Sequence, residues 1–158
     1  MGDFYTETLR ADPRFHSVAC IADPALLEPT FRAKVLAVIA DAKANGHDLR
    51  LVETFRSQAR QEALFRQGKT ELAHVGVHGF GLAADLVFFD HGKPNYDDSA
   101  YALLGHLAQA HGLIWGGDWG EPHKAHRFRD FDHVQRIRVE DQEKLFRGSW
   151  YPDARYTP

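Results

Sequence analysis

The sequence predicts a small α+β domain, because helical and strand patterns are mixed without a regular β-α-β alternation. Its 158 residues suit one domain of ordinary size, and neither a repeat nor a linker rich in Gly, Ser or Pro divides them. We therefore expect residues 1–158 to form a single domain. With 44% hydrophobic and 26% charged residues, the chain has enough apolar material for a core, which excludes wholesale disorder.

Two helices and a strand are predicted in the first half of the chain. Residues 30–45 carry apolar side chains at intervals of three and four, as the buried face of a helix does. Residues 47–54 then alternate and include β-branched side chains, which is typical of a strand. Ser57 can cap a second helix that ends at Gly68. The strand should therefore deliver Arg56 to the N-terminus of this helix.

The second half is predicted to contain a central strand, a third helix and several short elements. Residues 83–89 form an apolar run that fits a strand buried on both faces, and a turn follows at residues 91–95. Asp98 or Ser99 can cap the next helix, which ends at Gly112. The remaining elements are short strands at 113–115 and 133–137, an amphipathic piece at 139–146 and an extended polar tail.

Composition restricts the partners that this chain can have. Nineteen Lys and Arg against 22 Asp and Glu give a formal charge of −3, so a dedicated nucleic-acid binder is excluded. The lone Cys20 makes neither an internal disulfide nor a thiolate cage, so a bound metal would need His and carboxylate ligands.

No run approaches an integral membrane segment of about 20 apolar residues, and the N-terminus lacks the core of a signal peptide. We expect a monomer that is cytoplasmic when synthesised.

Three residues can supply the ligands of a divalent metal such as zinc. A catalytic zinc takes three His or carboxylate ligands and keeps one position open for water. Asp85 begins an otherwise apolar run, where an isolated buried carboxylate is costly unless it is paired or bound to metal. His78 lies seven residues earlier across glycines, and His133 belongs to a different strand. Asp130, three residues before His133, is spaced to serve as a base beside the metal.

These residues belong to a pattern that resembles the M15 zinc peptidases of peptidoglycan, and especially their L-alanyl-D-glutamate endopeptidase branch in phage endolysins. The resemblance covers about residues 49–137. Two positions depart from the family pattern, because Gly76 replaces a usual Ser and Asp132 replaces a small residue that is often Pro. The motifs that carry the resemblance are Phe55-Arg56-Ser57-x-x-Arg60-Gln61, His78-x-x-Gly81-x-Ala83-x-Asp85-Leu86, Trp115-Gly116-Gly117-Asp118-Trp119 and Asp130-x-x-His133-x-Gln135.

The resemblance implies a mainly antiparallel sheet flanked by helices, in the Hedgehog/DD-peptidase-like fold. It also implies one zinc ion per chain, held by His78, Asp85 and His133. Asp130 would be the general base. Arg56 would face the substrate or the developing oxyanion, unless it forms a salt bridge with Glu53 or Asp85.

The aromatic motif allows two interpretations. Trp115 and Trp119 either pack in the core or line a substrate groove, together with Asp118. The basic, His-rich residues 120–129 are either a solvated loop or a lid over the substrate.

The implied reaction is hydrolysis of the L-alanyl-D-glutamate bond in the peptidoglycan stem peptide. Two alternatives remain open, namely a D-alanyl-D-alanine carboxypeptidase or dipeptidase of the same fold, and a non-catalytic zinc or wall-binding module. We expect no separate wall-binding domain in this chain. The protein would reach the wall through a holin, a secretion device or lysis.

Overall fold

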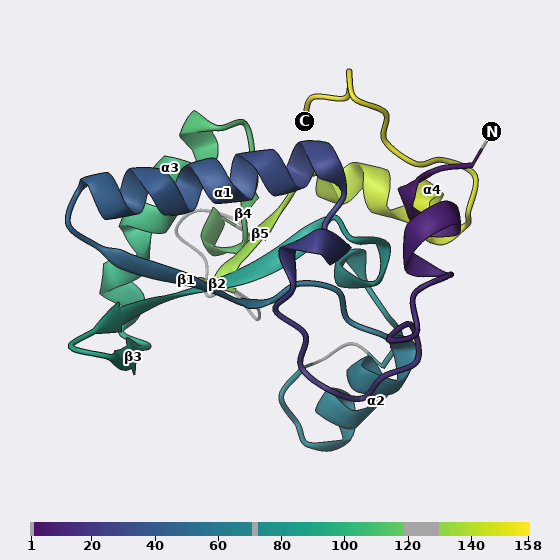
Figure 1. Cartoon of the computed structure of the whole chain (residues 1–158), viewed down its shortest axis with the longest axis horizontal. Helices are drawn as coiled ribbons and strands as arrows, with labels where there is room; N and C mark the ends of the chain where they lie inside the picture. Colours follow the sequence, from purple (N-terminus) through teal and green to yellow (C-terminus); the bar gives the residue numbers. More distant parts are fainter. Residues whose placement is uncertain (1, 71–72, 119–129) are drawn as a thin grey trace.

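The computed structural model describes residues 2–70, 73–118 and 130–158, and these form the predicted α+β architecture (Figure 1). Within them, one antiparallel sheet has the strand order β1-β2-β5-β4, and β3 forms a hairpin with β2. The strands are β1 Asp48–Glu53, β2 Ala83–Asp90, β3 Lys93–Asn95, β4 Ile114–Trp115 and β5 His133–Gln135. Because β2 is central, its residues meet partners on both sides.

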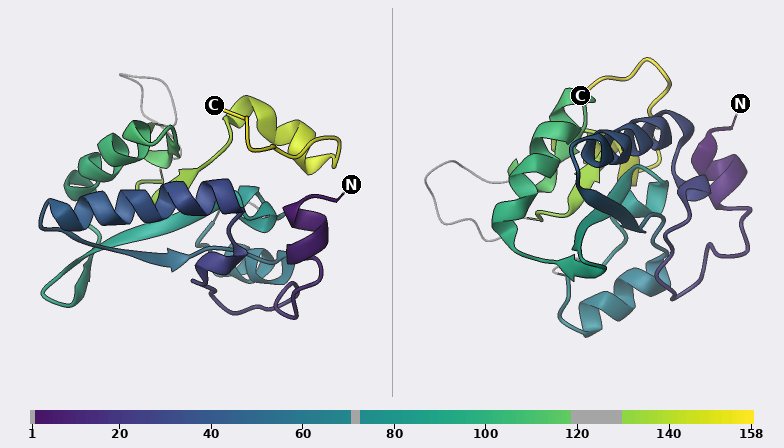
Figure 2. Two further views of the ribbon diagram at one scale, coloured as in Figure 1. Left: turned by 45° about the horizontal axis from the view of Figure 1, so that its top comes forward. Right: turned by 60° about the vertical axis from the view of Figure 1, so that its left-hand side comes forward.

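Helices cover both sides of this sheet. They are α1 Pro29–Ala44, α2 Gln58–Arg66, α3 Ala102–Ala110 and the short α4 Gln142–Phe146. Helices α1 and α3 lie on the same face of the sheet, whereas α2 lies on the opposite side (Figures 1 and 2). Ser57 caps α2 as predicted, because its Oγ accepts a hydrogen bond of 3.0 Å from the Arg60 amide.

The main core lies between the sheet and helices α1 and α3. Side chains alternate along a strand, so Ala84, Leu86 and Phe88 of β2 face this core and Asp85 faces away from it. Val87, on the same face as Asp85, is also buried, which confirms the prediction of a strand covered on both faces. The helical contribution to the main core comes from Phe31, Val35, Val38, Ala42, Leu104 and Ala108.

Two local predictions were wrong. The residue that caps the turn before α3 is Asp97, not Asp98 or Ser99, because Asp97 keeps an extended backbone and its carboxylate accepts from the Ser99 amide. A 3₁₀ turn at Asp98–Tyr101 then leads into α3. The predicted turn at residues 91–95 contains strand β3, since positive φ angles at His91 and Gly92 reverse the chain tightly enough for pairing to resume.

The C-terminal segment, residues 150–158, forms neither helix nor strand and packs against the domain. Trp150, Tyr151 and Tyr156 pack against a second apolar cluster that includes Val77 and Leu145. Arg136, which is fully buried, donates to Glu28 Oε2 at 3.1 Å and to the Asp153 carbonyl at 2.5 Å. These contacts fix the end of the chain to the start of α1.

A third apolar cluster attaches the N-terminal segment to the domain. Leu9 of a π-helical turn at Tyr5–Leu9 packs with Ile21, Leu26 and Phe55. The N-terminal turn thereby lies close to α4 and the C-terminal segment (Figure 2). None of the helices in the described ranges combines the length and the apolar character needed to cross a membrane.

Candidate metal centre

Strand pairing brings two of the three predicted ligands together. Asp85 of β2 is the direct partner of His133 of β5, and His78 comes from the 3₁₀ turn Val77–Phe80 that precedes β2. Asp85 Oδ1 lies 3.3 Å from His78 Nε2 and 3.5 Å from His133 Nδ1. Both histidines are 5% exposed and Asp85 is 9% exposed, so the three form one nearly buried cluster.

The tautomer of each histidine is fixed by a partner on its far side. His78 Nδ1 lies 2.9 Å from the Thr54 carbonyl oxygen, and His133 Nε2 lies 2.9 Å from Gln135 Oε1. Because both partners only accept, these ring nitrogens must carry the protons. In the neutral form of each ring, the lone pairs of His78 Nε2 and His133 Nδ1 therefore point toward Asp85. The Thr54 carbonyl therefore orients His78, although Gly76 offers no side-chain hydroxyl nearby in the chain.

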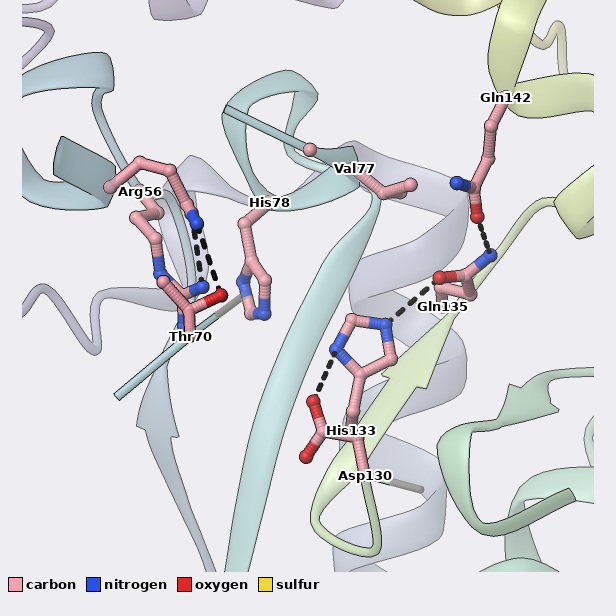
Figure 3. A pocket seen from close by; sticks show the side chains of 10 residues that line it. Arg56, Thr70, Val77, His78, Asp130, His133, Gln135 and Gln142 are labelled. Atoms are coloured by element: carbon pink, nitrogen blue, oxygen red, sulfur yellow. Dashed lines mark hydrogen bonds and ion pairs between the residues drawn. The ribbon is translucent and has the colours of Figure 1, made fainter. Parts of the chain in front are cut away.

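Gln135 is itself held in one orientation. Its Nε2 donates to the Ile137 carbonyl at 2.7 Å and to Gln142 Oε1 at 3.0 Å. Both acceptors require the amide nitrogen, so the amide oxygen must face His133 (Figure 3). A chain of hydrogen bonds thus runs from α4 through Gln135 to the ring of His133.

The donor set fits a zinc ion. Within the described part of the chain, Asp85 Oδ1 is buried and accepts no hydrogen bond. A buried carboxylate oxygen without a partner is costly, yet two imidazole lone pairs converge on the same place. Tetrahedral zinc with bonds of 2.0–2.1 Å sets its ligand atoms roughly 3.3 Å apart, close to the observed spacing. A bound cation would satisfy all three atoms at once.

Arg56 makes both of the salt bridges that were the alternatives to a contact with the substrate. Its Nη2 lies 2.7 Å from Glu53 Oε1 and 3.2 Å from Asp85 Oδ2. Arg60 Nε holds the other oxygen of Glu53 at 3.0 Å. The two carboxylates and two guanidinium groups balance in charge, which makes their burial tolerable.

An irregularity in β1 creates this network. The pairing of β1 with β2 shifts between Leu51 and Glu53, so Glu53 rather than Val52 lies opposite Asp85. Directly opposed residues share a face of the sheet, and the extra residue therefore moves Glu53 to the side of the predicted metal ligands. Two carboxylates then face one another, and Arg56 separates them.

The surrounding charges keep Asp85 ionised. Burial by itself would raise the pKa of Asp85, but the neighbouring His78 and His133 hold this pKa well below its usual range. Burial likewise opposes the charge on His133, whereas Asp85 and Asp130 raise the pKa of that imidazole. The cluster therefore favours a carboxylate and positive charge beside it, as a cation site requires.

Asp130 lies next to the cluster of His78, Asp85 and His133, but it is farther from His133 than Asp85 is. Its Oδ2 is 3.8 Å from His133 Nδ1, and its side chain is 32% exposed. A pocket opens here, and its lining includes Asp130, His78, His133 and Arg56 (Figure 3). Of the three carboxylates in this region, Asp85, Asp130 and Asp132, Asp130 is the one that lines the pocket.

Asp132 is the second carboxylate on this loop. Its backbone carbonyl accepts a hydrogen bond of 2.8 Å from the Leu86 amide. Burial, followed by the proximity of Asp130 and Asp85, raises the pKa of Asp132 to about 9. Carboxylate oxygens of Asp85, Asp130 and Asp132 lie within 4.8 Å of one another, so they form a second possible cation group.

Trp115 and Asp118 of the aromatic motif do not line the pocket. The ring of Trp115 packs in the main core, and its Nε1 donates to the Phe131 carbonyl at 2.7 Å. Asp118 accepts a hydrogen bond of 2.6 Å from Gln109 Nε2. The contact of Trp115 and Asp118 with substrate therefore stays a prediction. Trp119 and the loop at 120–129 lie outside the described residues.

Several pocket and supporting residues were given no role from the sequence. Gln135 was visible in the motif, and its position two residues after His133 puts both side chains on one face of a strand. Thr54 orients a ligand through its backbone carbonyl, which no side-chain pattern reveals. The other pocket residues without a predicted role are Gln61, Thr70, Val77 and Gln142.

Comparisons with known proteins agree with this geometry. A peptidase M15 family model, described as D-alanyl-D-alanine carboxypeptidase, matches residues 72–136. The peptidoglycan L-alanyl-D-glutamate endopeptidase CwlK of Bacillus subtilis (strain 168) is 26% identical over 144 residues, covering 78% of this chain and 83% of CwlK.

Solved structures of peptidoglycan peptidases have the same fold. The L-Ala D-Glu endopeptidase ChiX of Serratia marcescens matches with a TM-score of 0.52 and 24% identity, over 79% of this chain and 96% of ChiX. The vancomycin resistance D,D-pentapeptidase VanY, solved with Zn(II), matches with a TM-score of 0.53 and 15% identity, over 77% of this chain and 78% of VanY. In both sequence and fold, the chain therefore has the resemblance to M15 peptidases of peptidoglycan that its motifs predict.

Proposed function

We propose that this protein is a zinc-dependent endopeptidase that cleaves the L-alanyl-D-glutamate bond of the peptidoglycan stem peptide. The observation that carries the proposal is the buried Asp85 oxygen on which His78 Nε2 and His133 Nδ1 converge, with Asp130 beside them in a pocket. The choice of bond follows CwlK and ChiX, which are endopeptidases of this type by name. The protein would act as a monomer on the cell wall.

Each residue of the site has a distinct task in this proposal. His78, Asp85 and His133 hold the zinc ion, which when bound lowers the pKa of a coordinated water to about 7 and polarises the scissile carbonyl. Asp130 accepts the proton of the attacking water and returns it to the leaving amine. Arg56, at the pocket wall, holds Asp85 in place and contributes positive charge toward the developing oxyanion.

The proposal is tested by the products of peptidoglycan digestion. Zinc-loaded protein should release peptides with new amino termini on D-glutamate and leave L-alanine carboxyl groups on the glycan, detected by mass spectrometry and dinitrophenyl labelling. The matched control is His133→Ala, which should release neither product. Intact peptidoglycan after incubation with zinc-loaded protein would contradict the enzymatic proposal.

A second candidate is supported by the description of the matching family model. A D-alanyl-D-alanine carboxypeptidase would use the same zinc chemistry but remove the terminal residue of the stem peptide. Release of free D-alanine without a new glutamate amine would establish this alternative. The roles of His78, Asp85 and His133 would then stand, and only the choice of bond would change.

A further inference from the structure

We propose that Gln58 is a positioning residue for the substrate pocket, an inference that rests on the proposed function. Gln58 is the first residue of α2 and is not among the described residues that line the pocket. Its side chain instead holds residues 73–77, the segment before His78, which we call the pocket wall. Gly76 and Val77 of this wall line the pocket, and His78 follows them directly (Figure 3).

The amide group of Gln58 binds the pocket wall at two points. Its Oε1 accepts a hydrogen bond of 2.7 Å from the Val75 amide, and its Nε2 donates to the Ala73 carbonyl at 3.1 Å. Both bonds need the same orientation of the side chain, because only Oε1 can accept and only Nε2 can donate. The side chain thereby ties together the two ends of a bend at residues 73–74.

Helix α2 is a fixed support for this contact. Ser57 Oγ, at the start of the helix, donates a hydrogen bond to the Ser17 carbonyl. Gln61 follows Gln58 by three residues on the same face of α2 and is 1% exposed. Its Nε2 donates to Oγ1 of Thr70, another pocket residue, at 3.3 Å. Two amide side chains of one helix face therefore hold the chain where it approaches the pocket.

The pocket wall also packs on the turn that carries His78. Val75 fills the space beside Gly79, because a Cβ atom added to this glycine would lie 2.1 Å from Val75 Cγ2. The Gly79 amide in turn donates to the Gly76 carbonyl at 3.0 Å. The contact that Gln58 makes with the Val75 amide therefore fixes backbone that borders the pocket.

The predicted metal ligands do not depend on this contact. His78 Nδ1 lies 2.9 Å from the Thr54 carbonyl oxygen, and the carbonyl of His78 accepts a hydrogen bond of 3.3 Å from the Arg56 amide. The other two ligands are held by the pairing of β2 with β5. Loss of the two Gln58 contacts should therefore displace the pocket wall and leave the ligands in place. The effect should fall on the binding of substrate and not on the binding of zinc.

Gln58→Met tests the assignment. Met has a similar length and a similar helix propensity, but it makes neither of the two hydrogen bonds to the pocket wall. The matched control is Glu62→Ala, since Glu62 Oε1 accepts a hydrogen bond of 3.0 Å from Gln58 Nε2 within α2. This control removes a contact of the same side chain and leaves both contacts to the pocket wall. Circular dichroism and thermal unfolding should show that both variants are folded.

Two measurements on zinc-loaded protein decide the outcome. Hydrogen exchange at the Val75 amide should accelerate about tenfold in Gln58→Met, because the acceptor of this amide is lost. The KM for a soluble peptidoglycan fragment should rise about threefold to tenfold, the usual effect of losing one hydrogen bond, with kcat and zinc content little changed. Glu62→Ala should change none of these values.

Unchanged exchange at Val75 in Gln58→Met would overturn the inference, as would an unchanged KM beside faster exchange. Loss of zinc from this variant would also overturn it, because Gln58 would then support the metal ligands. The exchange measurement needs no hydrolysis. If the wild type failed to cleave peptidoglycan, the proposed function would be wrong, and exchange at Val75 would still decide whether Gln58 holds the pocket wall.

Discussion

Gly116 and Asp130 lie so close together that no side chain fits between them. A Cβ atom on Gly116 would be 2.2 Å from the carbonyl oxygen of Asp130, and the Asp130 amide donates to the Gly116 carbonyl at 3.2 Å. The neighbouring Trp115 fixes the same loop by donating to Phe131. The aromatic motif therefore places the proposed base, which is a different role from the substrate contact predicted for it.

We predict that Gly116→Ala displaces the loop at Asp130. The obstructing atom is backbone, which cannot rotate away, so the variant should lose about 1–3 kcal/mol of stability through overpacking. Activity should fall more than zinc content does. The control is Gly2→Ala, whose Cβ would meet only the flexible Glu7 side chain. An active Gly116→Ala protein with unchanged thermal stability would show that this close approach is unimportant.

A second prediction separates the two carboxylates of the loop. Asp130→Asn should keep its zinc and lose turnover by about 10² to 10⁴-fold, as expected for removal of a general base. Asp132→Asn should be much less harmful, because its observed contact to Leu86 is made by the backbone. Zinc content by elemental analysis and kcat on peptidoglycan check both variants. A dead Asp132→Asn beside an active Asp130→Asn would reverse the assignment.

The third prediction concerns the orientation of His133. Gln135→Leu removes the acceptor of the imidazole proton and should weaken zinc binding by about 10 to 100-fold, the usual effect of losing such a partner. Gln135→Glu keeps an acceptor and should weaken binding less. Gln142→Leu is the matched control, because Ile137 still holds the Gln135 amide. Competition with a chelating dye measures the affinities, and equal affinity of all variants would argue against this orienting role.

Metal removal gives a fourth prediction. His78→Ala, Asp85→Ala and His133→Ala should each lower the zinc content, and chelation of the wild type should lower its melting temperature, because bound metal stabilises the folded state. His111→Ala is a suitable control, since His111 pairs with Asp41 on α1, away from the site. Full zinc occupancy in all three ligand variants would refute the assigned ligand set.

A fifth prediction links stability to pH through the C-terminal segment. Hydrogen bonds from Lys144 and Tyr156 lower the pKa of Asp141 to about 2. A lowered folded-state pKa stabilises the protein above the ordinary pKa near 4, and this contribution disappears as pH falls from about 4 to about 2.

Asp141→Asn should therefore lower the melting temperature most at neutral pH, and the difference from wild type should shrink toward pH 2. Glu143→Gln, which breaks an exposed ion pair with Arg147 on the same helix, should have little effect at any pH. A constant difference between Asp141→Asn and wild type across this range would contradict the assigned pKa.

The sequence predicted the sheet and the site for related reasons. A buried carboxylate near the start of an apolar strand is costly unless it is paired, so Asp85 by itself predicted that a partner or a metal ion lies nearby. Helix α1 was equally clear, because its apolar spacing extends over four turns. These signals are local, and they depend only on the side chains nearby in the chain.

Features that depend on pairing could not be predicted. No sequence pattern indicates the shift of register between Leu51 and Glu53. This shift places Glu53 opposite Asp85, where Arg56 forms salt bridges with both carboxylates. The packing of the C-terminal segment was not predicted, because Pro152 and the polar residues there indicate only an extended chain. Its aromatic residues were the signal for packing, but their partner Val77 is distant in sequence.

The place of Asp85 in the sheet would link the proposed metal binding to correct folding. Its partners across the sheet are Glu53 on one side and His133 on the other. A slip of β2 by one residue would turn Asp85 into the main core and expose Leu86 on the opposite face. Only the native alignment therefore brings the proposed ligands together, so zinc uptake would report correct strand pairing. Zinc retained after buffer exchange would consequently distinguish natively refolded molecules from mispaired ones in a preparation, even with no substrate present.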